Sequence, residues 1–179
     1  MAGSSELSGK LARLWRDLGI PPDVAARSAR RIQAEAKRLV SIGRAKDDGR
    51  ILRLTPAAAR AWRRMSAAAT ADGVTLLPLS AYRSVARQTL IIRRKLARGE
   101  RIDDILMVSA LPGCSEHHTG RAIDFGAPDH LRLEATFART REYRWLRRQA
   151  GRFGFHLSYP RHNRQGITYE PWHWCWRAD

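Results

Sequence analysis

Two short segments, far apart in the sequence, carry the histidine and carboxylate side chains that most constrain how this chain can fold. The first segment contains His117 and Asp124, and the second contains Glu170 and His173. Two imidazoles and one carboxylate are a donor set that binds zinc with a coordination position left open, and a spare carboxylate beside it can act as a base. The fold is therefore expected to bring these two stretches together.

The spacing of the first segment indicates a loop followed by a strand. His117 and Asp124 do not share a helical face, because Thr119-Gly120 interrupts helical periodicity between them. The stretch Ala122-Ile123-Asp124-Phe125 alternates like a short strand. His173 is expected on a second extended segment, with a kink at Pro171 turning the Glu170 carboxylate towards the metal's open position.

Helical and strand-like patterns alternate along the whole chain. We predict helices over residues 11–19, 24–42, 56–71, 84–98 and 140–150, and strands over residues 51–54, 74–82, 123–126, 153–159 and 167–176, with a polar loop at 161–166. These elements predict an α+β fold, a small antiparallel sheet flanked by helices. The polar stretch at residues 45–49 predicts a boundary between a basic helical extension (1–45) and the main domain (46–179).

The chain is strongly basic along its whole length. Its 33 basic and 17 acidic residues give a formal net charge of +16. Residues 1–75 hold 15 basic and 7 acidic residues and residues 76–179 hold 18 and 10, so each part carries +8. An even distribution argues against a nucleic-acid-binding tail and favours anionic surfaces such as cell-wall polymers. A solvated, arginine-rich surface without a partner explains the charge equally well.

Targeting signals and cysteines do not determine the compartment of the protein or its disulfide state. No segment approaches the ~20 apolar residues of a membrane span, and the first ten residues do not resemble a secretory signal. A cytoplasmic location, a phage-type release and a missing leader therefore all stay open. Cys114 and Cys175 are too few for a disulfide scaffold, and whether they pair is left open.

The order of these motifs resembles the VanY-type D-alanyl-D-alanine carboxypeptidases, in a group of zinc peptidases that also holds lysostaphin-like enzymes and the hedgehog domain. The resemblance covers roughly residues 50–177 in one consistent order. Four blocks carry it: Ala81-Tyr82-Arg83-Ser84 with Gln88; Pro112 to Asp124; Trp145-Leu146 with Phe153 to Pro160; and Glu170-Pro171-Trp172-His173. It implies a hedgehog-like or D,D-peptidase-like fold.

The resemblance also implies a role for each candidate residue. His117, Asp124 and His173 would hold one zinc ion. Glu170 would be the general base and then the proton donor to the leaving amine.

Arg83 would have both a catalytic and a substrate-binding role, because it would neutralise the substrate carboxylate or the oxyanion that forms during attack. Ser115 and Gln88 would be supporting substrate contacts. The remaining histidines are expected to be non-ligands: His118, His130, His156 and His162.

The activity that the resemblance implies is hydrolysis of D-alanyl-D-alanine bonds in peptidoglycan stem peptides or precursors. We separately expect a monomer with no specific nucleic-acid partner. Alternatives with the same site are a D-Ala-D-Ala dipeptidase and an L-alanyl-D-glutamate endopeptidase of the endolysin kind. A non-enzymatic alternative is a metal-containing wall-binding module, which would not require Glu170. A basic nucleic-acid binder is a third class, but it gives no reason for the histidines and carboxylates.

Overall fold

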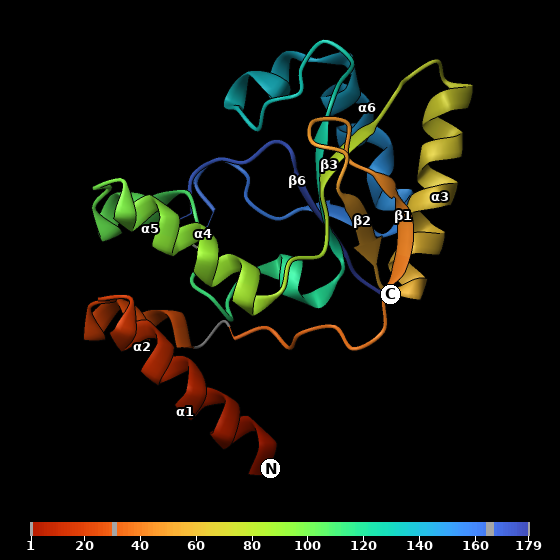
Figure 1. Cartoon of the computed structure of the whole chain (residues 1–179). Helices are drawn as coiled ribbons and strands as arrows, with labels where there is room; N and C mark the ends of the chain where they lie inside the picture. Colours follow the sequence, from red (N-terminus) through yellow and green to blue (C-terminus); the bar gives the residue numbers. More distant parts are fainter. Residues whose placement is uncertain (1, 30–31, 164–166, 179) are drawn as a thin grey trace. The chain divides into compact units, whose positions relative to one another are not determined.

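The computed structural model of the chain describes residues 2–29, 32–163 and 167–178 (Figure 1). The chain forms two compact units, one of Met1–Glu35 with Arg83–His118 and one of Ala36–Tyr82 with Thr119–Asp179. Each unit has its own hydrophobic core. The division into an extension of residues 1–45 and a domain of residues 46–179 stays a prediction.

A four-stranded antiparallel sheet forms the centre of the second unit. Its order is β3 (Leu77–Ser80), β4 (Ala122–Gly126), β6 (His173–Trp176) and β5 (Phe155–Leu157). Both edge strands are short, and β3 contains Pro78, a residue that sheets tolerate at an edge. The two central strands, β4 and β6, carry the candidate ligands Asp124 and His173.

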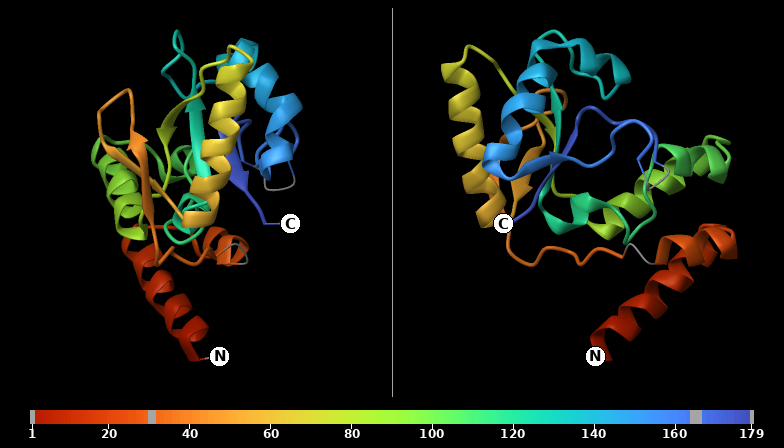
Figure 2. Two further views of the ribbon diagram at one scale, coloured as in Figure 1. Left: turned by 90° about the vertical axis from the view of Figure 1, so that its right-hand side faces the viewer. Right: turned by 180° about the vertical axis from the view of Figure 1, so that it is seen from behind.

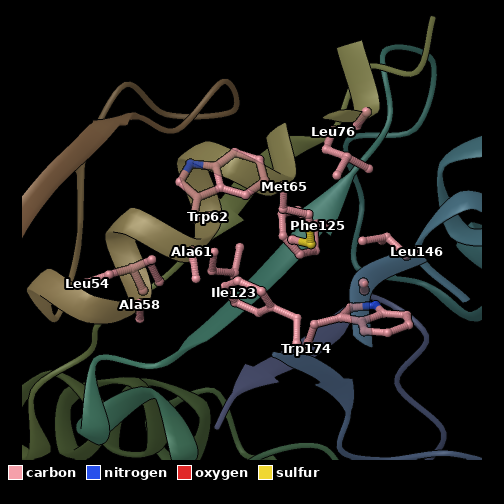
Figure 3. Close-up of a cluster of buried hydrophobic side chains, with 14 of the residues drawn as sticks. Leu54, Ala58, Ala61, Trp62, Met65, Leu76, Ile123, Phe125, Leu146 and Trp174 are labelled. Carbon is pink, nitrogen blue, oxygen red and sulfur yellow. The ribbon is translucent and has the colours of Figure 1, made fainter. Parts of the chain in front are cut away.

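Two helices, α3 (Pro56–Ala71) and α6 (Arg141–Gln149), pack on one face of this sheet (Figure 2). Pro56 occupies the first turn of α3, where its missing N–H costs nothing. Figure 3 shows the side chains that meet between these elements, among them Leu54, Ala58, Ala61, Trp62, Met65, Leu76, Ile123, Phe125, Leu146 and Trp174.

Strand alternation separates this core from the candidate site. Ile123 and Phe125 are fully buried among the core side chains (Figure 3), so Asp124 between them projects from the other face of β4. In the register of the sheet, Asp124 lies directly opposite His173 and Ile123 lies opposite Trp174. One face of the β4–β6 pair therefore stabilises the fold, while the other presents two candidate ligands.

A separate two-stranded sheet corrects one prediction. The helix predicted over residues 24–42 is wrong beyond α2 (Pro22–Ala29), because residues 40–44 form strand β1 (Val40–Arg44) instead. Strand β1 pairs antiparallel with β2 (Ile51–Leu54), with an irregularity between Ser41 and Gly43. Pairing with β2 outweighs the local helical pattern, since Val40 and Ile42 pack against the core. Residues 30 and 31 of the predicted helix lie outside the described residues.

The first unit is helical. It contains α1 (Ala2–Asp17), α2, α4 (Val85–Ala97) and α5 (Ile102–Met107). Its core joins the N-terminal segment to α4, α5 and the following loop through Leu11, Trp15, Leu18, Ile20, Ile92, Ile105 and Leu111. The Ser84 side chain caps α4 by accepting a hydrogen bond from the backbone N–H of Arg87 at 3.1 Å.

The predicted α+β class is confirmed, although several predicted strands are shorter than expected. Of residues 167–176, only His173–Trp176 is a strand, and residues 164–166 of the predicted loop lie outside the described part of the chain. Three 3₁₀ helices were not predicted: η1 (Glu116–Thr119), η2 (Ala135–Arg139) and η3 (Ala150–Phe153). No helix in the described ranges has both the length and the apolar character to cross a membrane.

Candidate metal centre and active site

Asp124 and His173 form the sheet-borne part of the candidate site. His173 Nδ1 lies 2.9 Å from Asp124 Oδ1, and the two side chains are each 3% exposed. Their direct pairing across β4 and β6 fixes their spacing, because the backbone hydrogen bonds of the sheet set the register. A carboxylate and an imidazole with facing donor atoms can hold a divalent cation between them.

Glu170 approaches His173 through a tight turn. The backbone N–H of His173 donates to the carbonyl of Glu170 at 3.1 Å, and Pro171 lies inside this turn. Glu170 Oε2 comes within 4.0 Å of His173 Nδ1, and the Glu170 side chain keeps 16% of its surface exposed. The predicted kink at Pro171 thus places a partly accessible carboxylate next to the sheet-borne ligands.

An aromatic ring that the sequence did not identify as part of the site packs against His173. The rings of Tyr159 and His173 lie with centroids 4.8 Å apart at an angle of 34°. The backbone N–H of Glu170 also donates to the carbonyl of Tyr159 at 3.1 Å. Tyr159 therefore contacts both the ring and the turn that carry the site, a role that no local pattern around residue 159 indicates.

His117 lies on η1, in a loop whose conformation depends on side-chain contacts. The backbone N–H of His117 donates to Ser115 Oγ at 3.3 Å. The carbonyl of His117 accepts a hydrogen bond from the backbone N–H of Arg83 at 3.2 Å. The side chains of Ser115 and His117 are both buried, at 5% and 4% exposure. Ser115 therefore shapes the loop that presents the imidazole.

The Arg83 guanidinium is oriented by Gln88. Arg83 Nη1 donates to Gln88 Oε1 at 2.8 Å, and Gln88 Nε2 donates to the carbonyl of Ala110 at 2.7 Å. Gln88 is fully buried on α4. Because both ends of its amide bind protein groups, the geometry fits a residue that holds Arg83 in place better than one that contacts substrate directly.

His118, next to the candidate ligand His117, is fully buried in a second set of contacts. Its Nδ1 lies 2.6 Å from the carbonyl oxygen of Arg83, and its Nε2 accepts from the backbone N–H of Gly113 at 3.1 Å. Burial lowers the pKa of His118 below its ordinary value of 6.5, although the hydrogen bond to Arg83 acts in the opposite direction. The sequence shows only two adjacent histidines and does not reveal these contacts.

Three of the predicted residues come together as a possible metal centre. His117, Asp124 and His173 each offer one ligand atom, and these atoms all lie within 4.8 Å of one another. The donor set, with two nitrogens, one oxygen and a fourth position left open, fits zinc. Within the described ranges no other histidine joins such a group of three.

The two cysteines lie in different surroundings. Cys175 is buried on β6, between the neighbours Trp174 and Trp176. Cys114 is half-buried and packs against the core of the first unit. Both therefore have a packing role.

The sequence matches the family model for VanY, D-alanyl-D-alanine carboxypeptidase, over residues 51–179. A putative carboxypeptidase of Bacillus subtilis (strain 168), YodJ, is 37% identical over 121 residues, which are 65% of this chain and 43% of that protein. The chain therefore spans less than half the length of this curated relative.

Solved structures show the same fold. The LdcB LD-carboxypeptidase aligns with a TM-score of 0.70 and 30% identity over 80% of this chain and 70% of that one. A mutant of the vancomycin-resistance D,D-pentapeptidase VanY, solved with Zn(II), aligns with a TM-score of 0.61 and 28% identity over 80% of each chain. Since the family model covers most of the sequence, the chain belongs to the VanY family of D-alanyl-D-alanine carboxypeptidases.

Proposed function

We propose that the protein is a zinc-dependent D,D-carboxypeptidase that removes the terminal D-alanine from peptidoglycan stem peptides or their precursors. His117, Asp124 and His173 would hold one zinc ion, and Glu170 would be the acid–base residue. The observation that carries this proposal is the convergence of the three ligand atoms within 4.8 Å, with the Glu170 carboxylate 4.0 Å from His173 Nδ1. A metal centre that served only structure would need no such extra carboxylate.

The acid–base work falls to Glu170. Bound zinc would supply Lewis acidity, polarising the scissile carbonyl and lowering the pKa of water. The Glu170 carboxylate accepts a proton from the attacking water and then donates it to the nitrogen of the departing D-alanine. The C–N bond therefore breaks with release of a neutral amine instead of an amide anion. The partial exposure of the Glu170 side chain, 16%, is consistent with access to both water and substrate.

Substrate recognition would depend on Arg83. A guanidinium binds a terminal carboxylate in a planar, two-point geometry, and a carboxypeptidase requires such a cation. Gln88 holds Arg83 through the 2.8 Å hydrogen bond and Ser115 shapes the loop before His117. In this proposal both support the site, and Arg83 makes the direct contact.

Digestion of purified muropeptides, followed by mass spectrometry with and without a chelator, tests this function. Pentapeptide stems ending in D-alanyl-D-alanine should lose one D-alanine, and the loss should stop with chelator and return with added zinc. Unchanged pentapeptide in a digest with zinc-loaded, folded protein would refute the proposal.

The same digest separates the alternatives. Loss of D-alanine from tetrapeptide stems would indicate an L,D-carboxypeptidase, the activity named for LdcB. Release of intact D-alanyl-D-alanine would indicate a dipeptidase, and release of the whole stem an endopeptidase. Zinc binding without any cleavage would favour a wall-binding module.

We further propose that the basic surface binds anionic cell-wall polymers. Arginine side chains on α3 line a cavity of about 460 Å³ together with the Trp176 ring; they are Arg60, Arg63 and Arg64. Guanidinium groups beside an aromatic ring suit a phosphate next to an apolar or sugar surface. The field of the whole chain, with a net charge of +16, would attract such polymers from a distance.

This second proposal is tested with poly(glycerol phosphate) as the probe. Replacing Arg60 and Arg64 by Gln should weaken binding more than the control, in which Arg93 and Arg94 are replaced by Gln. The two control arginines are exposed on α4, and their replacement removes the same amount of charge. Equal losses of affinity would show a diffuse charge effect without a site.

All proposed site residues come from a single chain, so we propose a monomer. Light scattering in solution checks this oligomeric state.

A further inference from the structure

His118 connects two segments of the first unit that are otherwise separate in sequence. It is 0% exposed, and its ring lies between the carbonyl of Arg83, which precedes α4, and the backbone N–H of Gly113. Nδ1 must donate to the carbonyl oxygen, and Nε2 must accept from the N–H. The two contacts therefore require a neutral imidazole protonated on Nδ1, and both ring nitrogens are used.

Gly113, on one side of His118, is anchored by the N-terminal segment. The backbone N–H of Gln33 donates to the Gly113 carbonyl at 2.7 Å, and Trp15 Nε1 donates to the carbonyl of Pro112 at 2.8 Å. A Cβ at Gly113 would lie 2.6 Å from Leu11 Cδ1, so the loop passes directly against α1. The Gly113 N–H group that donates to His118 is thus held by residues outside the matched range 51–179.

Arg83, on the other side, has its backbone fixed by the same loop. Its N–H donates to the His117 carbonyl at 3.2 Å, while its carbonyl accepts from His118 Nδ1 at 2.6 Å. Beyond the backbone, Gln88 orients the guanidinium. A shift of the Arg83 backbone would therefore move the guanidinium away from the place that Gln88 defines.

We propose that His118 is a positioning residue: it ties the backbone of Arg83 to a loop that the N-terminal segment anchors, and so holds the guanidinium ready for the carboxylate of the substrate. This inference rests on the proposed function, because it concerns recognition of a C-terminal carboxylate. It also gives Leu11, Trp15 and Gln33 of the N-terminal segment a role, because they hold the loop that contains Gly113.

The first test compares steady-state kinetics of three variants on a D-alanyl-D-alanine peptide. His118→Leu removes both hydrogen bonds, and we expect KM to rise roughly tenfold with kcat changed much less, the pattern of lost uniform binding. His118→Gln keeps one donor and one acceptor on its amide and should recover most of the loss. His156→Leu, the same replacement at an exposed residue of β5, should match the parent.

A double-mutant cycle separates positioning from general destabilisation. If His118 acts through Arg83, His118→Leu should raise KM in the parent protein but not in an Arg83→Gln background, where the guanidinium is already absent. Additive losses in the two backgrounds would overturn the proposal. So would a folded His118→Leu protein with the KM of the parent.

Amide hydrogen exchange supplies a readout that does not need activity. His118→Leu leaves the Gly113 N–H without its acceptor, so its exchange should accelerate by roughly tenfold, the factor that one hydrogen bond of this kind commonly contributes. His118→Gln should restore the protection, and unchanged exchange in His118→Leu would contradict the contact itself. Failure of the parent protein to hydrolyse the peptide would instead refute the proposed function, and with it the premise of this inference.

Discussion

The two segments that supply the candidate ligands are held in place by different means. Asp124 and His173 lie on central strands, where backbone pairing sets their separation and leaves their side chains 2.9 Å apart. His117 lies on a 3₁₀ turn whose shape depends on Ser115 and on hydrogen bonds to Arg83. The sheet fixes the spacing of Asp124 and His173 through its backbone hydrogen bonds. The conformation of the His117 loop depends instead on individual hydrogen bonds.

The candidate site should tolerate remote substitutions better on its sheet side than on its loop side. A sheet register changes only in whole-residue steps, and each step reverses the faces. A loop held by individual side chains can shift continuously when one contact is lost. Changes remote from the ligands should therefore affect the His117 and Arg83 region more than the Asp124 and His173 pair.

The largest effect is expected from removing a ligand. Asp124→Ala and His117→Ala should each lower zinc affinity by at least about 100-fold, since changes to outer partners alone cost 10–100-fold. Asp124→Ala should also destabilise the metal-free protein, by about 1–3 kcal/mol, because it removes a hydrogen-bond partner of the buried His173. Zinc analysis and urea unfolding measure both. Parental stability of the metal-free Asp124→Ala variant would contradict the role given to this pair.

Removing Glu170, the proposed acid–base residue, should be nearly as severe but should affect only the hydrolysis step. Glu170→Ala should retain zinc and lose hydrolysis by roughly 10²–10⁴-fold, the range for general acid–base catalysis. Asp103→Ala, which removes an exposed carboxylate from α5, is the matched control. Near-parental hydrolysis by the zinc-loaded Glu170→Ala protein would eliminate the proposed mechanism.

A substitution at Gly113 tests how tightly the loop packs against Leu11. Gly113 has φ +90°, and an added Cβ would meet Leu11 Cδ1 at 2.6 Å. Gly99 has a similar φ of +82° with nothing within 4 Å. Gly113→Ala should therefore cost about 1–3 kcal/mol more stability than Gly99→Ala, the range typical of overpacking. Chemical denaturation compares the two variants, and similar losses would show that Leu11 does not press on the loop.

The smallest effect concerns one hydrogen bond from the N-terminal segment. Trp15→Phe removes the donor to the Pro112 carbonyl while keeping most of the buried ring. We expect a loss of about 1 kcal/mol and a modest rise in KM, with zinc affinity unchanged. A fall in zinc affinity as large as that from His117→Ala would show that the loop depends on this contact far more than its energy suggests.

Local patterns predicted the sheet-borne side of the site well. The alternation around Asp124 indicated a strand, and strands were also predicted near residues 155 and 175; all three are confirmed. The α+β class followed from the same patterns. These features are local, since alternation and turn residues record which face of a strand is buried.

Features that depend on distant contacts were missed or misread. Residues 32–42 look helical in isolation, but Val40 and Ser41 pair with Leu54 and Arg53 of β2, a tertiary effect that local propensity cannot record. The contacts of His118 join residues 83, 113 and 118, and Tyr159 packs on His173. No spacing rule links such positions, so only the folded chain reveals them.

The outer strands of the four-stranded sheet bear on self-association. β5 spans three residues, and β3 contains a proline that cannot donate to an incoming strand. A second molecule would find little continuous backbone to pair with at either margin. The sheet that carries two candidate ligands on its central strands therefore has edges that resist templated aggregation.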